Sequence, residues 1–198
     1  MQRPFFVALV GLGALGLLVA CGGTGASGGG GSSGGSGSGG SGGVSPQSDW
    51  PSFGRDLLHS RSNPAETAIG VDTVANLELA WQHQGTEVTS TPSVVDGIVY
   101  FADWEGFVYA KRVSDGSEVW TTKLDVGASG SLAIGEERVF FGDFAGFVHS
   151  LDRATGQVLW SVQLEDHPNS NISSSPTLVA DMLIIGVASG ELEMLPFG

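Results

Sequence analysis

The stretch TPSVVDGIVYFADWEGFVYA, residues 91–110, decides the fold because the same pattern recurs in SLAIGEERVFFGDFAGFVHS, residues 131–150. The tryptophans that follow the two copies, Trp120 and Trp160, are also 40 residues apart. A fixed period of this length is typical of β-propellers, whose units are small sheets that cannot bury both faces alone. The repeat therefore predicts an all-β fold built from blades.

Short apolar runs alternate with turn signals inside each copy. The pair Asp96-Gly97 favours a type I′ hairpin, because both central residues of that turn need positive φ. Four short antiparallel strands make one blade, and the first copy predicts them at residues 93–95, 98–102, 107–110 and 118–122. We predict complete blades at residues 83–123 and 124–164, a partial blade of three strands within 165–198, and one lone strand over 77–82.

A processing signal and a tether precede the repeats. Residues 5–20 are nearly all apolar and follow the basic Arg3, which predicts an export signal in residues 1–21 that is too short to be a typical membrane span. The run ends in Leu-Val-Ala-Cys, which resembles the bacterial lipobox. The resemblance implies that Cys21 is diacylated and anchors the chain in a membrane, and Gly22 after it favours the outer membrane. Residues 22–48 are rich in Gly and Ser and predict a flexible tether.

The charge of the chain excludes one class of partner. The formal net charge is −13, and all 21 acidic residues follow Ser48. Such a surface repels nucleic acid and anionic lipid, so neither is an expected partner. The single cysteine excludes an internal disulfide, a cysteine-rich zinc site and a covalently attached haem.

The segments that flank the repeats resemble the quinoprotein alcohol dehydrogenases. The run DWPSFGRD at 49–56, with RSNP at 61–64 and Asp-His-Pro at 166–168, is similar to polyvinyl alcohol dehydrogenases in particular. The residues around Trp160 resemble the tryptophan docking motif of pyrroloquinoline quinone (PQQ) propellers, in which the ring packs between adjacent blades. This resemblance implies blade-docking roles for Trp81, Trp120 and Trp160. The resemblance also implies a propeller of about eight blades, so residues 49–198 are expected to be its truncated N-terminal part, with about two complete blades.

The resemblance also implies a cofactor site. The run GVASGE at 186–191 is similar to a Gly-Val-Ser-Gly-Gly-Glu segment of the family, in which the glutamate binds Ca²⁺ and the small residues face PQQ. This resemblance assigns Glu191 to the metal and Ser189 and Gly190 to the quinone. The family also has a preceding Thr-Gly-x-Pro element whose hydroxyl residue touches the quinone, and its counterpart here is Ser173. Ca²⁺ prefers hard oxygen ligands and polarises the quinone carbonyl for hydride acceptance from an alcohol. The vicinal Cys-Cys pair of the family is absent, and we assign no catalytic residue and expect no complete site in this chain.

Several polar residues are better explained by structure than by chemistry. Asp103 and Asp143 each precede a turn glycine by three residues, which predicts hydrogen bonding within a turn more than a metal or acid–base role. Arg55 and Asp56 are expected to pin an irregular loop. The histidines His59, His83 and His149 have no partner at metal-ligand spacing.

Two functions remain open from the sequence. The first is a lipid-anchored, periplasm-facing quinoprotein dehydrogenase that uses PQQ and Ca²⁺ and passes electrons to an envelope protein or cytochrome. The second is a non-catalytic propeller that binds protein partners, as the outer-membrane β-barrel assembly lipoprotein of this fold does. The dehydrogenase is the preferred hypothesis because of the Asp-His-Pro run and the opening segment.

Overall fold

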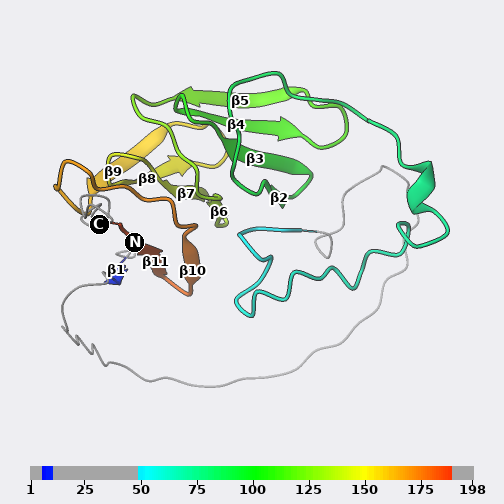
Figure 1. Ribbon diagram of the computed structural model, residues 1–198, viewed down its shortest axis with the longest axis horizontal. Coiled ribbons are helices and arrows are strands. Elements are labelled where there is room, and N and C mark those ends of the chain that lie inside the picture. The colour runs from blue at the N-terminus through cyan, green and yellow to red at the C-terminus, as the bar shows by residue number, and fades with distance from the viewer. Residues whose placement is uncertain (1–5, 11–48, 189–198) are drawn as a thin grey trace, which may run out of the picture.

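The computed structural model describes residues 6–10 and 49–188, and the regular elements of this part of the chain are β-strands apart from one short 3-10 helix (Figure 1). Two four-stranded antiparallel sheets form complete blades, each with its strands in sequence order. The first blade contains β2 (Ser93–Val95), β3 (Ile98–Ala102), β4 (Phe107–Arg112) and β5 (Glu118–Lys123). The second contains β6 (Ala133–Ile134), β7 (Arg138–Gly142), β8 (Phe147–Asp152) and β9 (Val158–Gln163).

The predicted strands of the two blades are confirmed, and so is the hairpin between β2 and β3. Asp96 and Gly97 have φ of 52° and 74°, as a type I′ turn requires. A register shift at Ala110/Lys111 in the first blade returns at Ser150/Leu151 in the second. The two blades are therefore copies in geometry as well as in sequence. The β3–β4 and β7–β8 turns lie at the same end as the starts of β2 and β6, and we call this end the upper end.

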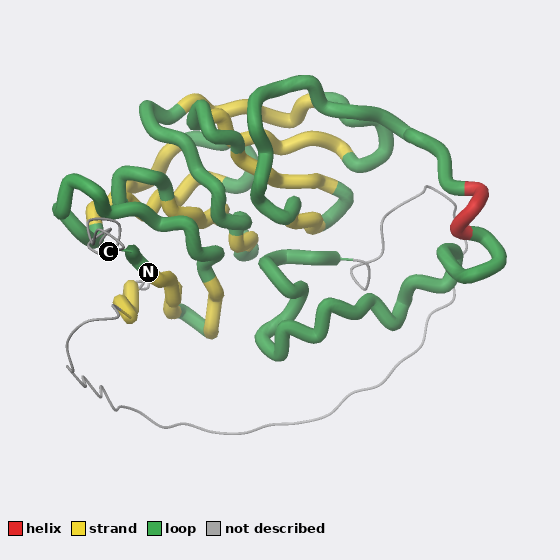
Figure 2. The backbone as a smooth tube through the Cα atoms, viewed as in Figure 1, coloured by secondary structure: helices red, strands yellow, loops and turns green. Residues whose placement is uncertain are grey.

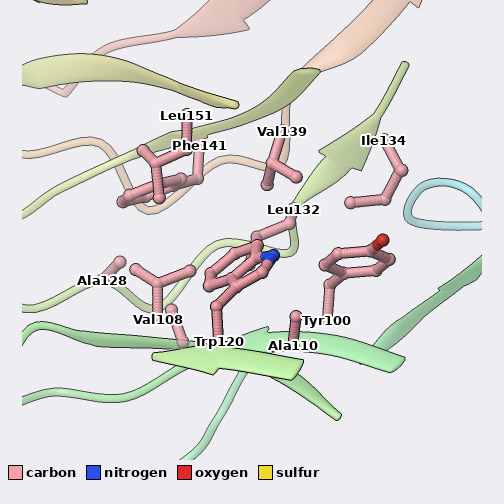
Figure 3. Packing of buried hydrophobic residues seen from close by; sticks show 11 residues of the cluster. Tyr100, Val108, Ala110, Trp120, Ala128, Leu132, Ile134, Val139, Phe141 and Leu151 are labelled. Atoms are coloured by element: carbon pink, nitrogen blue, oxygen red, sulfur yellow. The ribbon is translucent and has the colours of Figure 1, made fainter. Parts of the chain in front are cut away.

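The main core fills the space between the two blades (Figure 3). Tyr100 and Trp120 project from the first blade, and Phe141 and Leu151 face them from the second. Phe141 and Leu151 have no exposed surface. Burying a side chain of this kind contributes about 1.5–3 kcal/mol, so each blade stabilises the next through their shared face.

A second core lies between the second blade and a third sheet. Its buried members are Phe140, Val148, Ile172, Leu183 and Ile185. The third sheet consists of β10 (Thr177–Val179), β11 (Met182–Gly186) and β1 (Phe6–Val10), in the order β1-β11-β10. Strand β1 runs parallel to β11, from Phe6 opposite Met182 to Val10 opposite Gly186. It belongs to the segment that predicts the export signal, and the third strand predicted within 165–198 lies outside the described residues.

The segment before the first blade is irregular. Trp50 forms an antiparallel bridge with Val94 of β2, and residues 63–80 then run away from the blades, with the short 3-10 helix η2 (Val74–Asn76) at the far edge (Figure 2). The strand predicted over 77–82 is wrong: these residues have no regular structure. A strand needs a hydrogen-bonded neighbour, and no described strand lies beside this segment. Within the described ranges, no helix combines the length and apolar character needed to cross a membrane.

Candidate functional site

A cleft lined by hydroxyl groups lies at the upper end of the three sheets. Its volume is about 350 Å³. The residues that line it come from the loops that precede β2, β6 and β10, together with one phenylalanine from the opening segment: Phe53, Thr89, Ser90, Thr91, Ser129, Ser131, Ser173, Ser174 and Ser175. Eight of these nine side chains carry a hydroxyl group and none carries a charge. We call this feature the hydroxyl cleft.

Hydrogen bonds between consecutive sheets fix the lining. The backbone N–H of Thr91 donates to Oγ of Ser131 over 3.0 Å. The N–H of Ser131 in turn donates to Oγ of Ser175 over 2.9 Å. The loops before β2 and β6 are thus each capped by a serine of the next sheet. The convergence of hydroxyl groups follows from this repeated contact between sheets.

Two serines of the lining differ in how their hydroxyl groups are satisfied. Oγ of Ser174 donates to the carbonyl oxygen of Gly186 over 2.7 Å and accepts from its N–H over 3.0 Å. Oγ of Ser90 is buried and has no hydrogen-bond partner among the described residues, in a side chain that is 8% exposed. An unsatisfied buried hydroxyl costs about 1–3 kcal/mol. Ser90 is therefore a group that a bound ligand can satisfy.

Beside the cleft, each complete blade holds a buried aspartate at its upper turn. Oδ1 of Asp103 accepts the N–H groups of Glu105 and Phe107, which confirms the prediction of hydrogen bonding within the turn. Oδ2 of Asp103 accepts the hydroxyl groups of Thr86 and Tyr109. Burial alone raises the pKa of the Asp103 carboxyl, but these hydrogen bonds outweigh it and hold the pKa below its ordinary value. Burial, and then the same carboxylate, raise the pKa of Tyr109 to about 12.

The second blade replaces the tyrosine by a histidine. Oδ1 of Asp143 accepts the N–H groups of Ala145 and Phe147, again as predicted. Nε2 of His149 lies 3.0 Å from Oδ2 of Asp143, and Nδ1 lies 2.7 Å from Oγ of Ser161. Because the carboxylate only accepts, Nε2 carries a proton, and Nδ1 of a neutral ring accepts from the Ser161 hydroxyl. The chain Asp143–His149–Ser161 ties the turn to β8 and β9.

The structure brings only one of the predicted cofactor residues to the cleft. Ser173 is exposed and lines it. The other predicted site residues, Ser189, Gly190, Glu191 and the lipidation site Cys21, lie outside the described residues. Among residues 49–188, no group of three or more His, Cys, Asp and Glu side chains is placed to hold a metal ion.

The tryptophans assigned to blade docking lie at the sheet interfaces. Nε1 of Trp81 donates to the carbonyl oxygen of Val113 over 2.8 Å, and Nε1 of Trp120 donates to that of Arg153 over 2.9 Å. Each indole thus reaches the turn that joins the last two strands of the following blade. Trp160 is partly buried against the second core, with its ring 6.0 Å from that of Phe140.

Sequence reasoning missed most of the hydroxyl cleft. The signal was present: Thr89-Ser90-Thr91-Pro92, Ser129-Gly130-Ser131 and Ser173-Ser174-Ser175-Pro176 stand at matching places before three first strands. Serine and threonine are common in loops, and only the sheet-to-sheet contacts show that these three groups meet.

Blades that dock through a tryptophan onto the next blade, with their first strands converging at one cleft, define a β-propeller of the PQQ type. The chain belongs to the family described as outer membrane protein assembly factor BamB, which matches residues 68–196. It is also similar to a quinohemoprotein alcohol dehydrogenase of Comamonas testosteroni, with 36% identity over 76 residues. That match covers 37% of this chain and 11% of the dehydrogenase.

Solved structures show the same relationship. The crystal structure of quinohemoprotein alcohol dehydrogenase from Comamonas testosteroni superposes with a TM-score of 0.64 and 28% identity, over 74% of this chain and 24% of that one. The quinohemoprotein alcohol dehydrogenase ADHIIG from Pseudomonas putida HK5 gives a TM-score of 0.66 and 26% identity, over 73% and 23% of the two chains. The chain thus spans about a quarter of the length of these dehydrogenases.

Proposed function

We propose that this chain forms the cofactor-facing part of a lipid-anchored envelope dehydrogenase of the quinoprotein type, related to the polyvinyl alcohol dehydrogenases. The hydroxyl cleft carries this proposal, because it gathers donors from three consecutive sheets around a buried hydroxyl that has no described partner. Ser173, which the resemblance assigns to quinone contact, lines the same cleft. The similarity to quinohemoprotein alcohol dehydrogenases supports the reaction class.

The lining residues fit only part of PQQ. Hydroxyl donors such as Ser90 and Ser173 suit the carbonyl oxygens of a quinone. The three carboxylates of PQQ need cations or several N–H donors, and no lining residue in the described part of the chain carries positive charge. The described residues also offer no Ca²⁺ ligand set. The proposal therefore assigns to Ser90 and Ser173 the binding and orientation of the quinone oxygens, and to Glu191 the metal.

Direct titration tests cofactor binding. PQQ with Ca²⁺ is titrated into the full chain by calorimetry, for the wild type and for Ser173→Ala. We expect the variant to bind several-fold more weakly because it loses one hydrogen bond worth about 1 kcal/mol. Ser114→Ala is the matched control, since Ser114 is an exposed serine in the β4–β5 turn at the opposite end of the blade. Absence of binding, together with no dye-linked alcohol oxidation by the longest polypeptide that the gene encodes, contradicts the proposal.

The anchor has its own test. Cys21→Ala removes the only cysteine of the chain, so it blocks acylation while leaving the blades unchanged. We expect the wild-type protein in the membrane fraction, labelled by radioactive palmitate, and the variant unlabelled in the soluble envelope fraction. An unlabelled wild type contradicts lipid anchoring without bearing on quinone binding.

A scaffold for protein partners is the second candidate, and one observation favours it. Several apolar side chains of the opening segment are largely exposed, including Leu58 at 89%, Val71 at 94% and Leu79 at 77%. Exposed apolar side chains that gather on one segment are typical of protein-binding surfaces. The family name, outer membrane protein assembly factor, points in the same direction.

The two candidates separate in a crosslinking experiment in intact envelopes. Leu58→Glu with Val71→Glu should abolish crosslinks to an outer-membrane assembly protein if the scaffold role holds, and should leave PQQ binding unchanged. Capture of a cytochrome alone, unaffected by the double variant, supports the dehydrogenase.

A further inference from the structure

The loop of residues 52–62, which we call the cap loop, provides the one lining residue of the hydroxyl cleft that does not belong to the repeats. Its phenylalanine, Phe53, lines the cleft together with serines and threonines of all three sheets. The loop is attached just upstream, where Trp50 bridges to Val94 and the N–H of Ile134 donates to the carbonyl oxygen of Pro51. The cyan start of the described chain accordingly runs beside β2 in Figure 1. The cap loop is thus fixed to both blades at the cleft.

The cap loop holds an unusual backbone conformation. Arg55, His59 and Arg61 have φ of 79°, 50° and 51°, a region that residues other than glycine rarely adopt. Hydrogen bonds hold this shape: Oδ1 of Asp56 accepts the N–H groups of Leu58 and Ser60. Backbone of this kind persists only where its surroundings over-determine it, and it concentrates at ligand sites. The loop therefore presents its side chains in fixed directions.

A second side chain of the cap loop, Arg61, contacts the lining phenylalanine. Its guanidinium carbon lies 5.4 Å from the centroid of the Phe53 ring, in a cation–π contact. The His59 ring meets the same phenylalanine edge-on at 5.9 Å. Among the described residues, no carboxylate forms an ion pair with Arg61. A cation is thus stacked on a lining residue and is available to a ligand.

The cleft and the cap loop together supply the two kinds of group that bind an anion. Hydroxyl groups, with Ser90 unsatisfied, offer neutral donors, and a guanidinium offers charge and paired N–H groups suited to carboxylate or phosphate. The rest of the chain is poor in cations, with seven basic residues after Ser48 of which two, Arg55 and Arg61, stand in the cap loop. The loop that supplies Phe53 to the cleft thus also carries two of the few cations of the chain.

We propose that Arg61 is a specificity-determining residue of the hydroxyl cleft. Its guanidinium holds the anionic oxygens of the ligand, from a carboxylate or phosphate group, at the mouth of the cleft, while the hydroxyl groups bind the neutral end of the ligand. This inference rests on the proposed function for the identity of the cleft as a ligand site. It adds the charge that the lining residues lack, and it places the source of that charge outside the blades.

Calorimetry on the full chain tests the proposal with three probes: PQQ, benzene-1,3,5-tricarboxylate, which has carboxylates but no quinone, and inorganic phosphate. We expect at least one to bind, and Arg61→Gln to weaken that binding about tenfold, as loss of a charge-assisted hydrogen bond predicts. Arg61→Lys keeps the charge without the paired N–H groups and should lose about threefold. Arg112→Gln is the control, because this exposed arginine ends β4 at the opposite end of the blade.

The outcomes separate this inference from the proposed function. Binding of the tricarboxylate or phosphate that depends on Arg61, without binding of PQQ, supports the inference and overturns the quinone proposal. Binding of PQQ that Arg61→Gln leaves unchanged supports the quinone proposal and overturns the inference. Binding of none of the three probes overturns both. Unfolding temperatures of the variants are measured in parallel, and if Arg61→Gln is unfolded, Arg61→Lys decides, with an affinity equal to that of Arg112→Gln counting against the inference.

Discussion

Gly156 lies directly against the indole of Trp120, so closely that a Cβ atom on this glycine would stand 2.6 Å from Cε3 of the ring. The pair Gly116 and Trp81 has the same geometry in the preceding interface, with 2.7 Å to Cδ2. Both glycines also have positive φ, of 74° and 70°. Each complete blade thus needs glycine at this position for two reasons: the backbone is left-handed there, and a side chain would collide with the neighbouring tryptophan ring.

Replacing Gly156 by alanine should destabilise the protein by about 2–4 kcal/mol, because overpacking costs about 1–3 kcal/mol and a left-handed alanine adds about 1 kcal/mol. Urea unfolding measures this loss. Gly135→Ala is the control: its nearest neighbour would be 3.5 Å from the new Cβ and its φ is not in the left-handed region, so its effect should stay within about 1 kcal/mol. Equal losses for the two variants would show that Trp120 does not depend on a glycine surface.

The two blades use different rings for the same task, which gives a second prediction. Tyr109 and His149 stand 40 residues apart, and each reaches Oδ2 of the buried aspartate of its own turn. We expect His149→Tyr to fold with little loss, because the tyrosine hydroxyl can donate to Asp143 as Tyr109 does to Asp103. His149→Phe leaves the carboxylate and Ser161 without this partner and should cost about 1–3 kcal/mol.

Thermal and urea unfolding of the two His149 variants show which hydrogen bond of His149 stabilises the network. If His149→Tyr is as unstable as His149→Phe, the network depends on the second hydrogen bond, which Nδ1 accepts from the Ser161 hydroxyl, more than on the aspartate. Ser161→Ala is the companion variant that isolates that bond.

Local sequence signals predicted the blades well, whereas the features that were missed or wrong depend on contacts between residues far apart in the chain. The Asp96-Gly97 turn, the strand runs and the 40-residue period depend on residues near one another in the chain. The strand expected over 77–82 depended instead on a neighbouring strand, and the described chain provides none. The hydroxyl cleft was also out of reach, because the meeting of Thr91, Ser131 and Ser175 depends on how one sheet is placed against the next.

The resemblance and the structure contributed different parts of the candidate site. Ser173 was assigned from the resemblance alone, and the structure places it in the cleft. Arg61 and Phe53 could not have been assigned, since a loop with three left-handed residues other than glycine has no simple sequence pattern.

His83 makes stability depend on pH on the acid side. Burial, and then the charge of Lys111, lowers the pKa of this imidazole, whose ring lies 4.5 Å from that of Tyr109. Because the unfolded chain then binds the proton more readily than the folded one, stability falls as the pH drops below about 6.5. His83→Phe should flatten this fall between pH 7.5 and pH 5, as measured by urea unfolding. A fall of the same size in both proteins would assign it to other groups.

Tyr109 makes stability depend on pH at the opposite extreme. Burial and the hydrogen bond to Asp103 raise its pKa to about 12 from an ordinary value of 10.0. The folded chain therefore keeps the phenolic proton that the unfolded chain loses first, so the contribution is complete below pH 10 and is lost as the pH rises from 10 to about 12. A shift of this size corresponds to about 3 kcal/mol. The chain has two tyrosines, so tyrosinate absorbance in a Tyr100→Phe background follows Tyr109 alone. We expect its titration near pH 12 in the folded protein, and an earlier onset in Asp103→Asn, where the carboxylate charge is gone. Titration of Tyr109 near pH 10 in the folded Tyr100→Phe protein would show that the buried contact with Asp103 does not hold in solution.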